Sequence, residues 1–420
     1  MKKIILGAIT LTVIFSLSLA LFAVQALAQA HGGAGRKIIV FSGDLNDAEK
    51  AGGVKLNARK RVIAHTENEV GKAVSLGCEV VRETKELKAL RCPQGIAESL
   101  SLADDVRVFA LEDEEVGISN YSKVKILSAN ANQQIGANIV HASGNTGAGR
   151  KVVVLDTGYN YLHPELSSSY LGGKDFVNND NDPMDDQGHG SHVSGIITAD
   201  GVDPNAKGVA PDAGVIVGKV LDETGSGYFS DVVASIYWAV DGTDGVYGTI
   251  DDFNADAISL SLGTGTPYVY RGFCDGVFPD LTNAIKYAVQ KNVTVVVAAG
   301  NSGSAGVSIP GCISYSTTVG AVNSSDIVAS FSGRGKALDI TAPGVGIYSS
   351  VLGSAYATWS GTSMATPMIS GVVALVKYDH PTYTQANVEN KLFTTAKDLG
   401  KIGKDKDYGW GRVRANLAVQ

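Results

Sequence analysis

The sequence is short of charged residues, of cysteine and of long apolar runs, and each shortage excludes a class of protein. Charged residues make up 18% of the 420 residues and apolar residues 44%, which is not the composition of a disordered chain. The formal net charge of −7 argues against a basic face, and therefore against nucleic acid as a partner. We expect a folded chain of two or three domains, one of them large enough for a substantial core.

The few cysteines fall into two pairs that are close in sequence, Cys78 with Cys92 and Cys274 with Cys312. None of them lies in a Cys-x-x-Cys or Cys/His arrangement, so we expect no zinc site. Disulfides are permitted if the chain is exported, although the spacing alone does not prove either pairing.

One long apolar run stands at the N-terminus. Lys2 and Lys3 precede an apolar stretch that extends to about Ala23, and the small residues Ala26 and Ala28 follow it. This order is typical of a secretory signal peptide, here residues 1–28. A membrane anchor is the alternative, because the run approaches the length that spans a bilayer. We favour cleavage, and so expect a secreted protein that has no membrane segment after the signal is removed.

Residues 29–120 differ in composition from the rest of the chain. They are richer in Lys and Glu and poorer in Gly, and strand-like runs stand near both ends, at 37–43 and 106–113. This pattern predicts a small α+β unit.

From Tyr121 onward, apolar β-branched runs alternate with segments of helical period. Expected strands are 151–155, 215–221, 257–262, 293–299 and 317–322, and expected helices are 230–240, 281–291 and 362–377. Such continuously apolar strands are buried on both faces, which predicts a doubly wound α/β fold with a mainly parallel sheet. Sites in these folds form outside the carboxyl ends of the strands, where Asp156, Gly225, Gly263 and Asn301 fall.

Three motifs offer an acid, a base and a nucleophile in the order Asp, His, Ser: VVVLDTG (152–158), GHGSHVSG (188–195) and SGTSMATP (360–367). A serine hydroxyl needs a neutral imidazole to take its proton and a carboxylate to orient that imidazole. Asp156, His189 and Ser363 can fill these roles, with His192 as a second possible base. Taken alone, each of these residues is more often a cap, a surface residue or part of a loop. A lipase-type enzyme is excluded, because its acid and base follow the nucleophile.

These motifs resemble those of the subtilisin-like serine proteases (subtilases), and the resemblance extends from about Tyr121 to Gln420. It implies that His189 is the catalytic base and that His192 is structural. It also implies that Asn301, in AAGNSG (298–303), stabilises the oxyanion together with the backbone N–H of Ser363.

The resemblance further implies that residues 29–120 form a ferredoxin-like propeptide that assists folding, inhibits the enzyme and is removed autocatalytically. The scissile bond is then expected between Gly117 and Lys125, with residues 121–420 as the catalytic domain. An ordinary N-terminal domain that stays attached is the alternative.

Two glycine-containing segments resemble those that flank an extended substrate in subtilases, and they contain Gly225, Ser226, Gly227, Ser261, Leu262 and Gly263. Main-chain pairing to such segments is tolerant of sequence, so we expect broad specificity. The pocket for the residue before the scissile bond (P1) is expected between Gly263 and the stretch around Ser308. It contains no evident carboxylate, which favours a large apolar or aromatic P1 residue. A plain turn is the alternative for 225–227.

The segment 175–186 is dense in Asp, and similar subtilase loops bind calcium, which would relieve the repulsion between the carboxylates. Predicted ligands are Asp175, Asp180, Asp182 and Asp185, with Glu165 at a separate site. The insertion 241–256 is also acidic but lacks the EF-hand spacing. A solvated acidic loop is the alternative for both segments.

These observations predict a secreted, monomeric, calcium-stabilised serine endopeptidase that acts on proteins and peptides and is inhibited by its own propeptide. The competing hypothesis is a catalytically silent relative that serves as a binding or scaffold protein.

Overall fold

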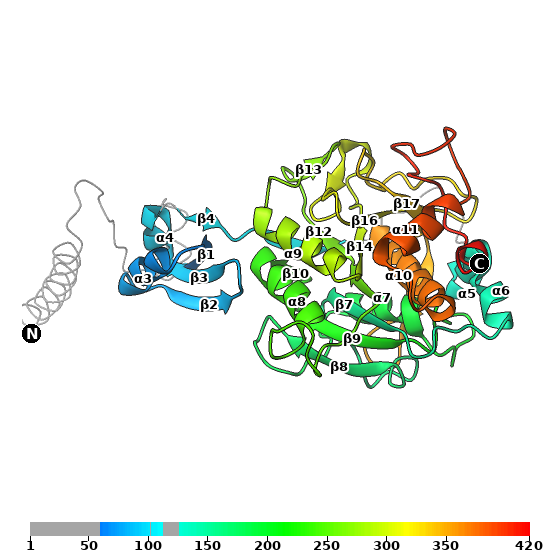
Figure 1. Cartoon of the computed structure of the whole chain (residues 1–420), viewed down its shortest axis with the longest axis horizontal. Helices are drawn as coiled ribbons and strands as arrows, with labels where there is room; N and C mark the ends of the chain where they lie inside the picture. Colours follow the sequence, from blue (N-terminus) through cyan, green and yellow to red (C-terminus); the bar gives the residue numbers. More distant parts are fainter. Residues whose placement is uncertain (1–58, 101, 112–125) are drawn as a thin grey trace, which may run out of the picture. The chain divides into compact units, whose positions relative to one another are not determined.

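The computed structural model describes residues 59–100, 102–111 and 126–420 (Figure 1). The contacts within the chain divide it into Met1–Arg59 and Lys60–Gln420. The predicted signal peptide, the run 37–43 and the expected scissile bond between Gly117 and Lys125 all lie outside the described residues. No helix of the described residues is long and apolar enough to cross a membrane.

The N-terminal part of the described chain forms a small α+β unit, as predicted. Its sheet has the order β2-β3-β1-β4, and the elements are β1 (Arg59–Ala64), β2 (Glu79–Glu83), β3 (Lys88–Pro93), β4 (Ala103–Asp104), α3 (Glu67–Ser75) and α4 (Gln94–Leu100). Its small apolar core contains the Cys78–Cys92 disulfide, with an S–S distance of 2.07 Å. Such a crosslink stabilises a small unit, whose own core is limited. The Cys274–Cys312 pair is also bonded, at 2.04 Å.

The main sheet has seven parallel strands in the order β17-β16-β14-β11-β7-β9-β8 (Figure 1). The strands are β7 (Lys151–Asp156), β8 (Tyr170–Asp175), β9 (Gly214–Lys219), β11 (Ala257–Leu260), β14 (Thr294–Ala298), β16 (Thr317–Val322) and β17 (Ile340–Pro343). All five predicted strands are confirmed. The two that the pattern missed, β8 and β17, are the edges: β8 is partly exposed and contains two glycines, and β17 ends in a proline.

Helices cover both faces of this sheet, which confirms the doubly wound fold. Val152 and Val154 pack into one apolar cluster with α7 (His189–Thr198) and α10 (Thr362–Asp379). Val153 and Leu155, which alternate with them along β7, pack into a second cluster with α8 (Phe229–Asp241) and α9 (Pro279–Gln290). Successive side chains of a strand point to opposite faces, so the two clusters lie on opposite sides of the sheet.

The remaining elements are short. The helices are α5 (Ser128–Ile135), α6 (Ala137–Ala142), α11 (Gln385–Thr394), α12 (Ala415–Ala418) and the 3₁₀ turn η1 (Gly303–Ala305). Three small sheets contain β10 (Ser226–Tyr228), β5 (Arg107–Ala110) and β12 (Leu262–Gly263); β13 (Val269–Tyr270) and β15 (Val307–Ser308); and β19 (Tyr356–Trp359), β18 (Ile347–Ser350) and β6 (Ile126–Leu127).

Candidate active site

The end of β7 and the beginning of α7 bring the predicted acid and base together. Asp156 Oδ1 lies 2.7 Å from His189 Nδ1, and both side chains are completely buried. The backbone N–H of Thr157 donates to the same carboxylate oxygen at 2.7 Å. An ionised carboxylate can only accept hydrogen bonds, so this contact puts the ring proton on Nδ1 and leaves Nε2 as the basic nitrogen.

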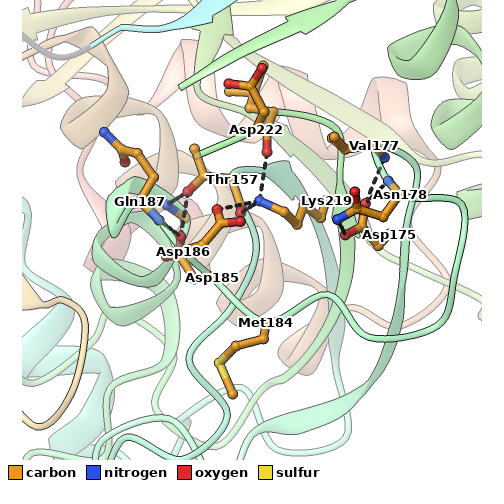
Figure 2. A network of polar contacts seen from close by, with 12 residues as sticks. Thr157, Asp175, Val177, Asn178, Met184, Asp185, Asp186, Gln187, Lys219 and Asp222 are labelled. Atoms are coloured by element: carbon orange, nitrogen blue, oxygen red, sulfur yellow. Dashed lines mark hydrogen bonds and ion pairs between the residues drawn. The ribbon is translucent and has the colours of Figure 1, made fainter. Parts of the chain in front are cut away.

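The loop before His189 is held by Asp185 (Figure 2). Its Oδ1 accepts hydrogen bonds from the Thr157 hydroxyl and from the backbone N–H groups of Gln187 and Gly188, at 2.8–3.0 Å. Its Oδ2 accepts from both the N–H and the hydroxyl of Ser191, at 2.8 and 2.6 Å. Asp185 therefore accepts two of the N–H groups at the start of α7, those of Gly188 and Ser191, and ties this helix to the segment that follows Asp156.

A buried lysine, Lys219, connects the segment after Asp156 with the loop before α7 and the end of β9. The sequence did not predict this role. Lys219 is 1% exposed, and the β7–β9 register places it beside Asp156. Its ammonium group donates to the carbonyl oxygens of Thr157 and Leu221 at 2.6 and 2.9 Å and to Asp186 Oδ1 at 2.6 Å (Figure 2). Each of the three protons therefore has an acceptor, and Lys219 fixes three segments that meet next to the acid.

We expect Lys219→Met to lower kcat by about tenfold to a hundredfold, because small displacements of catalytic groups have effects of that size. Methionine keeps the apolar stem but leaves the Thr157 and Leu221 carbonyl oxygens without this donor. KM should change less, since we expect the substrate to be held by main-chain pairing to β10 and β12. Steady-state kinetics on a peptide substrate measure both constants. Lys174→Met, on neighbouring β8, removes the same charge as a control. If Lys219→Met is less stable than the wild type but keeps a normal kcat, the lysine does not position the catalytic groups.

The predicted nucleophile, Ser363, is the second residue of α10 and is completely buried. Its hydroxyl donates to the carbonyl oxygen of Ser261 at 3.0 Å, and the Ser261 hydroxyl donates back to the Ser363 carbonyl oxygen at 3.0 Å. The start of α10 is thus fastened to the segment leading into β12. The first backbone N–H groups of a helix have no carbonyl partner within the helix, and the dipole favours negative charge there.

Asn301 follows β14 and has a fixed amide orientation. Its Oδ1 accepts hydrogen bonds from the N–H and the hydroxyl of Thr362, at 3.0 and 2.9 Å. Its Nδ2 therefore points the other way, where it donates to the carbonyl oxygen of Leu111 at 2.9 Å. The amide that was predicted to stabilise an oxyanion thus holds a peptide carbonyl group.

Leu111 directly follows β5, which lies between the two predicted substrate segments. β5 pairs antiparallel with β10 on one side and with β12 on the other. The Ala110 N–H donates to the Gly225 carbonyl oxygen at 2.9 Å, and the Leu111 N–H donates to the Ser261 carbonyl oxygen at 3.4 Å. The structure brings all the predicted substrate residues to this strand: Gly225, Ser226, Gly227, Ser261, Leu262 and Gly263.

Close packing explains two of the glycines in these segments. A Cβ atom on Gly227 would lie 2.1 Å from the carbonyl oxygen of Val220, so no larger residue fits there. A Cβ atom on Gly263 would lie 3.0 Å from both Leu111 Cδ1 and Ser308 Cβ. The Leu111 side chain therefore lies where Gly263 and Ser308 were expected to bound the P1 pocket.

The structure does not bring the predicted calcium ligands together. Among the described residues, no group of three or more His, Cys, Asp or Glu side chains could hold a metal ion. Their oxygens instead accept hydrogen bonds from the chain, mostly from nearby backbone N–H groups, as for Asp175, Asp180, Asp182, Asp185 and Glu165. Acidic loops form such turns without a metal, and as arranged these five residues do not fit a calcium site.

His192, the second possible base, is packed as a neutral group. It stacks on Trp359 with ring centroids 4.5 Å apart, and its Nε2 lies 3.3 Å from the Ala357 carbonyl oxygen. Burial, reinforced by the nearby His189, lowers the pKa of His192 to about 3. This environment favours the structural role expected for it.

The low pKa of His192 predicts how stability depends on pH. The unfolded chain takes up a proton on this imidazole near pH 6.5, whereas the folded protein does so only near pH 3. The free energy of unfolding should therefore fall as the pH falls below 6.5, by about 2 kcal/mol at pH 5 from this group alone. In a Ser363→Ala background, which prevents self-digestion, His192→Gln should flatten this fall in urea titrations. An unchanged slope would contradict the prediction.

A model of the subtilase family matches residues 147–411, which include Asp156, His189, Asn301 and Ser363. The chain belongs to the subtilase family. Subtilisin E of Bacillus subtilis (strain 168) is 39% identical over 292 residues, which are 68% of this chain and 70% of that protein. Subtilisin of Bacillus pumilus and Subtilisin Savinase of Lederbergia lenta are each 38% identical, over 68% of this chain and 97% of theirs. As a subtilase, the chain is a serine endopeptidase.

Proposed function

We propose that this subtilase cleaves proteins and peptides through an acyl-enzyme on Ser363. His189 takes the hydroxyl proton as Ser363 attacks the scissile carbonyl carbon and later gives it to the leaving amine, while Asp156 holds the imidazole. Asn301 donates a hydrogen bond to the oxygen as it becomes negative. One observation carries the proposal: the Leu111 carbonyl oxygen lies 2.9 Å from Asn301 Nδ2, at the end of a strand bound as a substrate would be.

The same observation supports Leu111–Glu112 as the bond that the enzyme cuts in its own precursor. Leu111 holds its carbonyl on the oxyanion donor, and the four residues before it form β5. This bond precedes the position between Gly117 and Lys125 that the resemblance implied. We therefore place the end of the propeptide at Leu111.

Inhibition by the propeptide follows from the position of β5, which fills the space between β10 and β12. No substrate can pair with these two strands while β5 is there.

A buried charge cluster connects the proposed propeptide to the catalytic domain. Arg61 lies 2.9 Å from Asp105 and 3.0 Å from Asp231, and Arg82 lies 2.9 Å from Asp231. Asp105 also accepts hydrogen bonds from the N–H and the hydroxyl of Ser230, and thereby caps the start of α8.

Broad specificity with an apolar P1 preference is supported by the same contacts. Main-chain pairing of β5 reads no side chains, and the leucine side chain packs on Gly263 and near Ser308. We further propose that the enzyme works outside the cell after signal cleavage. Calcium stabilisation stays a prediction from the family resemblance. It would require the 175–186 loop to rearrange, and the melting temperature of Ser363→Ala in excess calcium and in chelator measures it.

We expect Leu111→Asp to slow precursor cleavage at least a hundredfold, because a carboxylate in this apolar pocket loses its hydration without a partner. Leu111→Met, of similar volume and polarity, should be cut at a near-normal rate. Gel analysis gives the rates, and mass spectrometry of the wild-type mature form should find Glu112 as its first residue. A first residue between 118 and 125 with no prior cut after Leu111 would contradict the assignment of the bond.

A further inference from the structure

A hollow of about 540 Å³ on the catalytic domain is lined mainly by cations. They come from three separate segments and are Arg271, Arg334, Lys336, Lys404 and Lys406. Such a concentration of positive charge is unusual in a chain of net charge −7. Neither the triad nor β5 and its flanking strands contribute to the lining.

Backbone hydrogen bonds hold the three segments at fixed spacing. The Gly335 N–H donates to the Lys406 carbonyl oxygen at 3.0 Å, and the Lys336 N–H donates to the Arg271 carbonyl oxygen at 2.8 Å. A Cβ atom on Gly335 would lie 2.9 Å from that Arg271 oxygen, so the approach is as close as the chain allows. The backbone positions that carry the charged side chains are therefore fixed relative to one another.

The cations are only partly neutralised. Lys404 pairs with Asp339 at 2.7 Å and Lys406 with Asp407 at 3.1 Å, and Arg334 lies 3.8 Å from Asp407. Asp405, the lining carboxylate, accepts backbone N–H groups of its own loop. Within the described residues, Arg271 and Lys336 have no ion-pair partner, and the buried Arg334 Nε has no hydrogen-bond acceptor. A buried guanidinium N–H without an acceptor is costly, and an anion is the kind of acceptor that suits it.

The hollow adjoins the loop that carries Asn301. The Arg334 N–H donates to the Gly303 carbonyl oxygen at 3.1 Å, and the Gly333 N–H donates to the Gly300 carbonyl oxygen at 2.7 Å. The segment that carries Arg334 is thus hydrogen-bonded to the backbone on both sides of Asn301. Ser304, in the loop that carries Asn301, lines the hollow.

We propose that this hollow binds a small anion carrying two or more phosphate groups, and that the bound anion steadies the oxyanion loop. Five cations from three segments suit a multiply charged ligand better than a single carboxylate, and the planar donors of arginine match phosphate oxygens. The site is independent of the catalytic assignment and would exist in an inactive variant.

Calorimetric titration of full-length Ser363→Ala with inorganic tripolyphosphate, at constant ionic strength and without divalent cations, tests the site. We expect saturable binding that Arg271→Gln and Arg334→Gln each weaken about tenfold. Lys401→Gln, which makes the same charge change outside the hollow, should bind normally. Arg271 is exposed, so its variant remains informative if Arg334→Gln folds poorly.

Two outcomes would overturn the site: no saturable binding, or equal weakening by Lys401→Gln, which would show attraction to net charge alone. Hydrogen exchange of residues 299–306 tests the link to the loop. We expect slower exchange in the presence of tripolyphosphate, and unchanged exchange at saturation would overturn the coupling.

Discussion

Ser363→Ala is expected to abolish turnover and to leave the precursor uncut after Leu111. The variant lacks the hydroxyl oxygen that we propose forms the acyl-enzyme, while the Asp156–His189 contact and Asn301 stay in place. The loss in kcat should be about 10⁶-fold, the size measured for the corresponding serine of subtilisin. The residual rate measures what the oxyanion donors and substrate binding achieve alone. Kinetics on a peptide substrate and gel analysis of the purified precursor give both results.

Two controls separate chemistry from folding. Ser370→Ala removes another buried hydroxyl of α10, which donates to Ser259 Oγ, and should cost about 1 kcal/mol of stability while turnover is kept. Cooperative thermal unfolding of the Ser363→Ala precursor would show that the variant is folded, so that its lack of cleavage reports the lost chemistry. Self-shortening of Ser363→Ala at the wild-type rate in the absence of added enzyme would contradict self-processing.

The interior of the sheet could be predicted because its physics is local. Strands such as β7 and β14 are buried on both faces, so their central residues are apolar and the run is visible in the sequence. The edge strands β8 and β17 could not be predicted in this way. Each has one neighbouring strand, tolerates glycine, exposure or proline, and therefore leaves no apolar run.

The site residues divide in a similar way. The predicted acid, base, nucleophile and oxyanion amide lie in distinctive motifs at the ends of predictable elements, and the Asp156–His189 contact follows from those ends. Lys219 could not be predicted, since a lysine within an apolar run gives no sign of whether its ammonium group is buried. What reveals it is the presence of three acceptors from separate segments.

The acidic loop shows the converse limit. Asp and Asn at short spacing are typical both of calcium loops and of turns in which carboxylates accept backbone N–H groups. Asp175 and Asp185 take the second role in this structure.

The position of Leu111 could not be predicted from the sequence either. It depends on the register of β5 between two strands that follow it by more than a hundred residues.

We expect Asn301→Leu to lower kcat by about a hundredfold to a thousandfold with little change in KM, the effect measured for the corresponding asparagine of subtilisin. The amide acts mainly when the carbonyl oxygen becomes negative, so its loss raises the barrier more than it weakens binding.

A lower kcat in Asn301→Leu could also arise from disorder, since leucine removes the acceptor for the N–H and hydroxyl of Thr362 at the start of α10. Asn301→Asp separates the two causes. Aspartate keeps oxygens for Thr362 but has no N–H for the substrate carbonyl, and its charge opposes the oxyanion. If the donated hydrogen bond matters, Asn301→Asp should be at least as slow as Asn301→Leu while melting closer to the wild type. A substantially active Asn301→Asp enzyme would show that Asn301 serves to position Thr362 and not to stabilise the oxyanion.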